Sequence, residues 1–167
     1  HNKNIIHCDI KPDNIMISPT NEIVFIDFEE TGGTSGYISP EIIYNKHDES
    51  IYTIKVDIWS LGMTMLNVYV NDYSNKLYKI ANLQEKILAQ EYIDLENDIN
   101  EIILSNEVIL PNEVILSNEN KSDANSINVN KQMAELLIKI LNINPDKRIS
   151  LSFIIKELEN IYDLFET

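Results

Sequence analysis

The chain has 167 residues, of which 27 are acidic and 13 are basic, and the difference leaves a formal net charge of -14 at pH 7. So large a negative charge argues against a nucleic-acid-binding surface, and a 44% share of apolar residues supplies one hydrophobic core, which excludes a chain that is disordered throughout. The single cysteine, Cys8, excludes an internal disulfide, and we therefore expect an intracellular, cytoplasmic protein.

A β-hairpin is predicted close to the start of the chain. Two short apolar runs, Ile15 to Ile17 and Ile23 to Asp27, flank the segment Ser18-Pro19-Thr20-Asn21. Proline presets its own backbone dihedral, and serine and asparagine bond to nearby backbone groups, so these residues favour a tight turn. We expect two strands that are joined by this turn.

Two helices of different character are predicted next. A short one begins at Ser39-Pro40-Glu41, which supplies a cap residue, a first-turn proline and an early carboxylate, and it ends near Asn45. The other extends from Ile54 to Val70 and is too short and too polar to span a bilayer, so we expect no membrane insertion. Apolar residues surround it, which predicts a buried helix at the centre of the core: Val56, Ile58, Trp59, Leu61, Met63, Met65, Leu66 and Val68.

The C-terminal part is also predicted to be helical, because apolar residues recur there every three or four positions. Three groups show this spacing: Leu77, Ile80, Leu83, Ile87 and Leu88; Met133, Leu136, Leu137, Ile140 and Leu141; and, after Ser150, Leu151, Ile154, Ile155, Leu158, Ile161, Tyr162 and Phe165. With strands only near its start, the chain is predicted to have a mainly α fold.

A repeat of six residues interrupts the helical pattern. Asn-Glu-Ile-Ile-Leu-Ser at 100–105 is followed by Asn-Glu-Val-Ile-Leu-Pro at 106–111 and Asn-Glu-Val-Ile-Leu-Ser at 112–117. Six residues advance a helix by about 240°, which would spread the apolar triplets over three faces, and Pro111 would break the helix. We predict a surface insertion over 100–130 that ends in a polar loop at 118–130, with a short β-solenoid as the alternative.

Four polar side chains of complementary chemistry cluster around the predicted hairpin. Asp9, Lys11 and Asn14 precede its first strand, and Asp27 follows its second. A carboxylate accepts a proton from a nucleophile, and an ammonium group offsets the charge on a transferring group. An amide oxygen and a second carboxylate hold a hard divalent cation. This set favours phosphoryl transfer.

Residues 7–14 read His-Cys-Asp-Ile-Lys-Pro-Asp-Asn, and residues 27–29 read Asp-Phe-Glu. These segments resemble the catalytic-loop and metal motifs of the eukaryotic-type protein kinase family. Three more segments resemble, in the family's order, its substrate-docking segment, the start of its central helix and its C-terminal arginine motif: Gly33 to Glu41, Asp57 to Gly62 and Asn144 to Arg148. The resemblance implies a kinase-like C-terminal lobe over 1–167, a helical bundle whose small hairpin carries the catalytic and metal motifs.

The resemblance also implies a serine/threonine protein kinase that transfers the γ-phosphoryl group of ATP to a protein substrate. Asp9 would orient the substrate hydroxyl and accept its proton, and Lys11 would steady the transferring group. Thr34 would brace both of them. Asn14 and Asp27 would bind Mg²⁺. Met16 would lie under the adenine ring. Three structural roles come with the same resemblance: stacking of His7 with Phe28, an ion pair of Glu41 with Arg148, and attachment of the catalytic loop through Asp57.

Two substitutions and one absence leave other interpretations open. Cys8 stands where many kinases carry a phosphate-binding arginine, and Glu29 replaces the glycine of the metal motif. The N-terminal lobe of a kinase does not precede residue 7, so we expect it upstream in a longer protein and expect residues 1–167 alone to be inactive. The alternatives are a pseudokinase or scaffold that only binds, and a phosphotransferase for small molecules.

Overall fold

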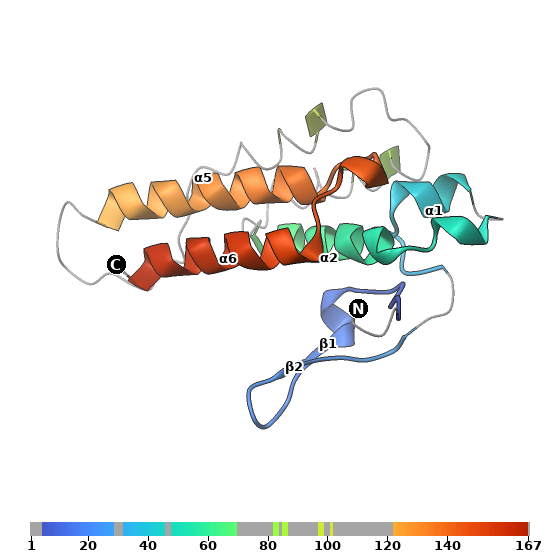
Figure 1. Cartoon of the computed structure of the whole chain (residues 1–167), viewed down its shortest axis with the longest axis horizontal. Coiled ribbons are helices and arrows are strands. Elements are labelled where there is room, and N and C mark those ends of the chain that lie inside the picture. Colours follow the sequence, from blue (N-terminus) through green and yellow to red (C-terminus); the bar gives the residue numbers. More distant parts are fainter. Residues whose placement is uncertain are drawn as a thin grey trace.

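The structure, a computed structural model, describes residues 5–28, 32–45, 48–69, 82–83, 85–86, 97–98, 101 and 122–166. The hexad repeat apart from Glu101, residue Glu29 and most of the helix predicted over 77–88 lie outside these residues. The elements with bounds are β1 (Ile15–Ile17), β2 (Ile23–Phe25), α1 (Pro40–Tyr44), α2 (Ile54–Tyr69), α5 (Ser122–Ile140) and α6 (Leu151–Glu166), with single 3-10 turns at Pro12–Asn14, Glu49–Ile51 and Pro145–Lys147. α5 packs against α2 and α6, and the hairpin projects from the helical part (Figure 1).

The hairpin forms where the sequence predicts it. β1 and β2 are antiparallel, with Ile15 opposite Phe25 and Ile17 opposite Ile23. The turn is closed by the Asn21 N–H, which donates to the Ser18 carbonyl at 2.9 Å, and Asn21 has a φ of 61°, which asparagine tolerates. β2 ends at Phe25, two residues earlier than predicted.

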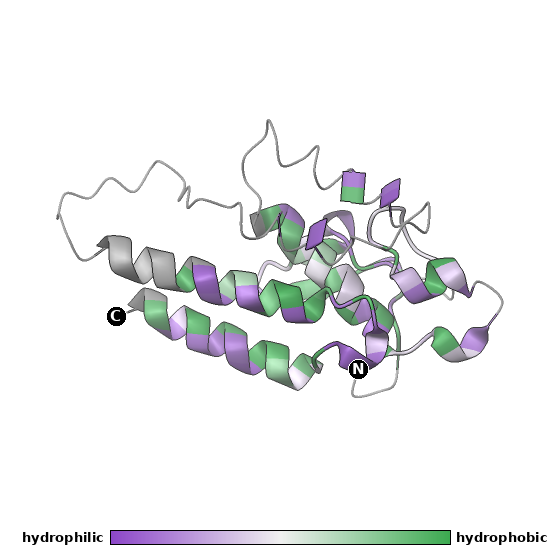
Figure 2. Cartoon of the chain, turned by 90° about the horizontal axis from the view of Figure 1, so that it is seen from above, coloured by the Kyte–Doolittle hydropathy of each residue, from purple (hydrophilic) through white to green (hydrophobic). Residues whose placement is uncertain are grey.

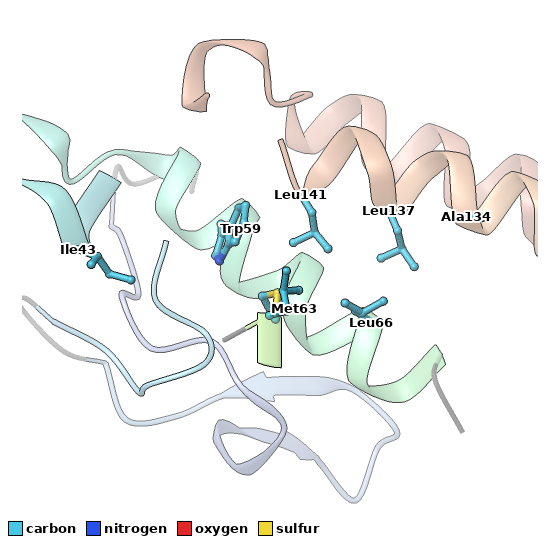
Figure 3. Packing of buried hydrophobic residues seen from close by; sticks show 8 residues of the cluster. Ile43, Trp59, Met63, Leu66, Ala134, Leu137 and Leu141 are labelled. Atoms are coloured by element: carbon cyan, nitrogen blue, oxygen red, sulfur yellow. The ribbon is translucent and has the colours of Figure 1, made fainter. Parts of the chain in front are cut away.

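Helix α2 is the centre of the core, as predicted. Trp59, Met63 and Leu66 are fully buried, and Figure 3 shows Met63 and Leu66 directed toward Leu137 of α5 and toward Leu141, the residue that follows α5. The two helices approach closely at Gly62, where an added Cβ would lie 2.4 Å from Ile140 Cγ2. The prediction of a core position at Val68 is wrong: its side chain is 71% exposed, because it lies about 200° around the helix from the fully buried Leu66.

Helix α5 begins earlier than the sequence predicts. The prediction of a polar loop over 118–130 is wrong for 122–130, since α5 starts at Ser122. Val129 is buried in the core, four residues before Met133, so packing of this apolar stripe carries the helix into a polar segment. Leu83, from the predicted helix over 77–88, is also buried.

Helix α6 occupies the predicted place, but its apolar stripe is only partly covered. Ile154 and Ile161 are buried, whereas Ile155 and Tyr162 are 49% and 62% exposed, which corrects their prediction as core residues. The reason is geometric: the predicted stripe is wider than the face that α5 covers. In Figure 2, apolar and polar residues alternate along this helix. No helix within the described residues combines the length and the apolar character that crossing a bilayer requires.

A buried ion pair joins parts of the chain that lie 107 residues apart. The two terminal nitrogens of Arg148 each donate to one carboxylate oxygen of Glu41 at 2.6 Å. The same guanidinium group donates to three backbone carbonyls, those of Asn142, Ile143 and Lys55, and it lies 4.9 Å from the centre of the Trp59 ring. This side chain therefore fastens the start of α1, the start of α2 and the loop before α6 to one another.

We predict that Arg148→Ala destabilises the protein by about 3–5 kcal/mol, because Glu41 is then left as a buried carboxylate without its partner. Urea unfolding measures the loss, and Lys147→Ala, which removes an exposed positive charge one residue away, is the control. A variant Arg148→Ala that unfolds at the same urea concentration as the control would contradict this role.

Candidate catalytic site

Helix α2 carries a stripe of four polar residues on a helix that is otherwise largely apolar. Asp57, Ser60, Thr64 and Asn67 follow one another at intervals of three, four and three residues, which places them along one face. We call these four residues the α2 polar stripe. Each of them contacts a segment that carries predicted site residues, and the stripe therefore determines how those segments lie.

Asp57 fixes the start of the catalytic loop. One of its carboxylate oxygens accepts the His7 N–H and the other accepts the Cys8 N–H, both at 2.9 Å. Cys8 has a φ of 67°, which is unfavourable for a residue with a side chain, and the Asp57 contact holds it there. Burial raises the pKa of Asp57, and the two N–H bonds oppose that rise.

Asp9 lies at the centre of a compact network that joins three other predicted site residues. One carboxylate oxygen accepts the backbone N–H of Thr34 at 2.7 Å. The other accepts the Lys11 ammonium group at 2.7 Å and the Asn14 amide at 2.8 Å. Lys11 also donates to the Thr34 hydroxyl at 2.5 Å. The structure thus brings Asp9, Lys11, Asn14 and Thr34 together, from two segments that are 20 residues or more apart.

The network keeps Asp9 and Lys11 charged at neutral pH. Burial by itself would raise the pKa of Asp9, but the hydrogen bonds from Lys11 and Thr34 outweigh burial, so that its pKa lies below the ordinary value. The hydrogen bond to Asp9 raises the pKa of Lys11. A carboxyl group with a lowered pKa stabilises the fold at neutral pH, and this contribution is lost as the pH falls through the lowered value.

Asn14 and Asp27 have the donor atoms that Mg²⁺ requires. The Asn14 amide nitrogen is used by Asp9, which directs the amide oxygen away from that carboxylate. The Ile26 N–H donates to the Asn14 carbonyl at 3.0 Å, which holds the residue before Asp27 next to Asn14. Asp27 itself is exposed and has a φ of 61°. Mg²⁺ is typically held by one or two protein oxygens together with phosphates and water, so two donors suit it. Among the described residues no group of three His, Cys, Asp or Glu side chains is arranged to bind a metal.

Aromatic and apolar side chains surround His7. Its ring stacks on Phe28 with 4.2 Å between ring centres and meets the edge of Phe25 at 5.8 Å. Together with Ile155 and others, these rings line an apolar cavity of about 590 Å³. Met16 is not part of the Asp9 network: it lies in β1 opposite Val24, and its side chain is 53% exposed.

The segment from Gly33 to Tyr37 is held against the catalytic loop and α2. A Cβ atom at Gly33 would lie 2.6 Å from the Cys8 carbonyl oxygen, and Gly33 has a φ of 112°, so only glycine fits. The Tyr37 carbonyl accepts the Ser60 hydroxyl at 2.8 Å, and the Tyr37 hydroxyl accepts the Asn67 amide at 2.7 Å. The sequence prediction omitted Ser60, Thr64 and Asn67, although their three- and four-residue spacing is the signal that would have identified them.

Comparisons with known proteins agree with this geometry. Residues 1–158 match the family described as "Protein kinase domain". The MAP kinase kinase skh1/pek1 of Schizosaccharomyces pombe is 38% identical over 84 residues, which cover 44% of this chain and 22% of that protein. The serine/threonine-protein kinase ppk34 of the same yeast is 27% identical over 169 residues, which cover 94% of this chain and 39% of that protein. The chain spans less than half the length of the curated relatives it matches.

We predict that Asp57→Ala destabilises the protein, because it leaves the buried N–H groups of His7 and Cys8 without acceptors at a cost of about 1–3 kcal/mol each. Val68→Ala, an exposed change on the same helix, is the control and should stay within about 0.5 kcal/mol of wild type. Urea unfolding compares the two, and equal unfolding free energies would show that Asp57 does not hold the loop.

Proposed function

The chain belongs to the protein kinase domain family, and from this premise we propose that it is the C-terminal lobe of a serine/threonine protein kinase. In this proposal the γ-phosphoryl group of ATP passes to a serine or threonine hydroxyl of a protein substrate. The observation that carries it is the Asp9 network, in which one buried carboxylate is held by Lys11, Asn14 and Thr34. A turn cap or a structural aspartate needs neither the ammonium group nor this number of donors.

The proposed roles follow from charge and position. Asp9 stays ionised at neutral pH, so it can orient the substrate hydroxyl and accept its proton as the hydroxyl oxygen forms a bond to the γ-phosphorus and the bond from that phosphorus to the ADP oxygen breaks. The Lys11 ammonium group offsets the negative charge of the transferring group. Thr34 holds both side chains, since it donates to Asp9 and accepts from Lys11.

Mg²⁺ and ATP complete the proposed site. The Asn14 amide oxygen and the Asp27 carboxylate would hold Mg²⁺, which when bound supplies positive charge next to the phosphates. Asp27 is close enough to Lys11 to contribute to the raised pKa of that ammonium group, which supports a shared location for the metal and the transferring group. Met16 would form the floor under the adenine.

The exposed surface of the hairpin supports the proposal that an N-terminal lobe is encoded upstream. Met16 and Ile17 in β1 and Ile23 in β2 are each more than half exposed, as is Phe28 just after β2. Apolar side chains this exposed and gathered at one short hairpin are typical of a contact with another part of the protein or with a ligand. In a kinase the nucleotide and the other lobe would cover it.

A pseudokinase or scaffold is the second candidate. The observation in its favour is Glu29, which replaces the glycine of the metal motif and adds a carboxylate next to the proposed Mg²⁺ ligand Asp27. A pseudokinase would bind ATP without transferring its phosphate, and this result would separate it from a kinase.

In the protein extended by its natural upstream sequence, we predict that Asp9→Asn lowers kcat by about 10²- to 10⁴-fold, because the proton acceptor is lost. Asp163→Asn removes the same charge from an exposed position on α6 and should leave kcat unchanged. The assay is transfer of labelled phosphate to a pool of serine-centred peptides. Turnover of Asp9→Asn at the rate of the control would refute the assigned role.

Residues 1–167 alone are predicted to show no phosphate transfer and only very weak ATP binding. The described part supplies a floor and metal ligands, whereas effective pockets bury about 70–90% of their ligand's surface. Calorimetric titration with Mg²⁺ and ATP tests this, and the extended protein is the comparison. Micromolar binding by residues 1–167, together with transfer to a basic protein, would contradict the prediction.

A further inference from the structure

We propose that the connection from Phe28 to Gly33 keeps the site permanently assembled, so that phosphorylation of this connection does not activate the protein and instead lowers its activity. The inference rests on the proposed function, because activity here means phosphate transfer by the protein extended with its natural upstream sequence. It concerns regulation, which neither the Asp9 network nor membership of the family determines.

The connection is short. Four residues, 29–32, separate Phe28 from Gly33, and the five Cα-to-Cα steps reach at most about 18 Å, so neither end can move far without the other. Connections of two to six residues are ordinary links, whereas loops that act as lids are usually longer than about 12 residues. Gly32 and Gly33 have φ angles of 104° and 112°, a backbone that favours glycine. The connection is therefore too short to form a separate regulatory loop.

Both ends of the connection are held by consecutive residues of the catalytic loop. Three contacts hold them: the Phe28 ring stacked on His7 with 4.2 Å between ring centres, Gly33 against the Cys8 carbonyl oxygen, and the Thr34 N–H bonded to Asp9 at 2.7 Å. The approach at Gly33 is so close that an added Cβ would lie 2.6 Å from the Cys8 oxygen. A rearrangement of the connection would have to break contacts at both ends.

The surroundings of the connection are poor in groups that receive a phosphoryl group. In the part of the chain that the structure describes, the cation that bonds to this segment is Lys11, and its ammonium group is already bonded to Asp9 and to the Thr34 hydroxyl. The residue that meets Gly33 is Cys8, whose thiol is buried and has none of the donors with which an arginine binds phosphate. Phosphorylation would therefore create no pairing that orders the site.

A phosphoryl group on the connection would act against the site. The one hydroxyl group among residues 29–32 belongs to Thr31, which follows two glutamates in the sequence. Phosphorylation adds about 1.5 to 2 negative charges at pH 7 and is disruptive next to carboxylates. It would also attract the Lys11 ammonium group, which holds Asp9 and offsets the charge of the transferring group. Activity is therefore expected to fall.

Position 31 tests the charge argument in the extended protein. Phosphoserine is incorporated there through an expanded genetic code, and Thr31→Ser is the matched control without the phosphoryl group. We expect Thr31→Ser and Thr31→Ala to keep the kcat of wild type for serine-centred peptides. Phosphoserine should lower kcat by about two- to fivefold, the size of a partly screened ion pair. A phosphoserine variant at least as active as its control would overturn the proposal, as would a tenfold or larger loss of kcat in Thr31→Ala.

The length of the connection is tested by insertion. Six glycine and serine residues are inserted between Thr31 and Gly32, and the same insertion after Asn118, in the polar segment before α5, is the control. The longer connection should speed amide exchange at Thr34 by about fourfold, because the effective concentration of joined ends falls as the −3/2 power of the connection length. The melting temperature should match that of the control. Exchange at the wild-type rate would refute the role of the connection.

The kinase function and this inference fail separately. A wild-type protein that transfers no phosphate would refute the kinase function, and exchange of the Thr34 amide in the lengthened variant would still decide whether the connection holds the site. A wild-type protein that transfers phosphate only after modification of Thr31 would retain the kinase function and refute the inference.

Discussion

The α2 polar stripe holds the two segments that carry Asp9, Lys11 and Thr34, because its side chains bond to His7, Cys8 and Ile10 in one segment and to Tyr37 in the other. α2 is buried because apolar residues surround it, and burial makes its few polar groups costly unless they are bonded. The surrounding loops supply those bonds. Asp57 accepts two N–H groups of the catalytic loop, whereas Ser60 and Asn67 donate to the backbone carbonyl and the hydroxyl of Tyr37. The central helix of the core is thus also the element against which the site is assembled.

The site itself is held by charge and burial together. Asp9 is 1% exposed, and an isolated carboxylate with so little exposure would be strongly disfavoured as an anion. Lys11, Asn14 and the Thr34 N–H compensate it, and the result is a carboxylate that stays ionised and keeps a fixed orientation. Two non-glycine residues at the borders of this region, Cys8 and Asp27, have positive φ angles. Such backbone persists only where surrounding contacts enforce it, which is typical of functional sites.

Sequence patterns predicted those helices, strands and turns that are determined by residues close together in the chain. The hairpin turn, the proline at the start of α1 and the apolar surface of α2 depend on residues within a few positions of one another, and the structure confirms them. Exposure was predicted less well, because it depends on what distant segments cover. The same limit applies to the site, where Asp9, Lys11, Asn14 and Thr34 were identified by their motif. Among the residues that hold them, Asp57 was also identified by its motif, whereas Ser60, Thr64 and Asn67 came only from the structure. The expected burial of Val68, Ile155 and Tyr162 and the expected start of α5 were wrong, because an apolar pattern does not show which face of a helix a distant segment covers or where a helix begins in a polar stretch.

The central claim is that side chains hold the catalytic loop and the Gly33 to Tyr37 segment rigidly, with Asp57 of α2 as the acceptor for the loop and Asp9 as the acceptor for the Thr34 N–H. Amide hydrogen exchange, followed by NMR in the extended protein, tests it most directly, because the N–H groups of His7, Cys8 and Thr34 bond to Asp57 and Asp9 and not to any regular backbone ladder. The account predicts that these three amides exchange about as slowly as those in the middle of α2. Exchange as fast as that of the exposed hairpin turn at Thr20 would contradict it.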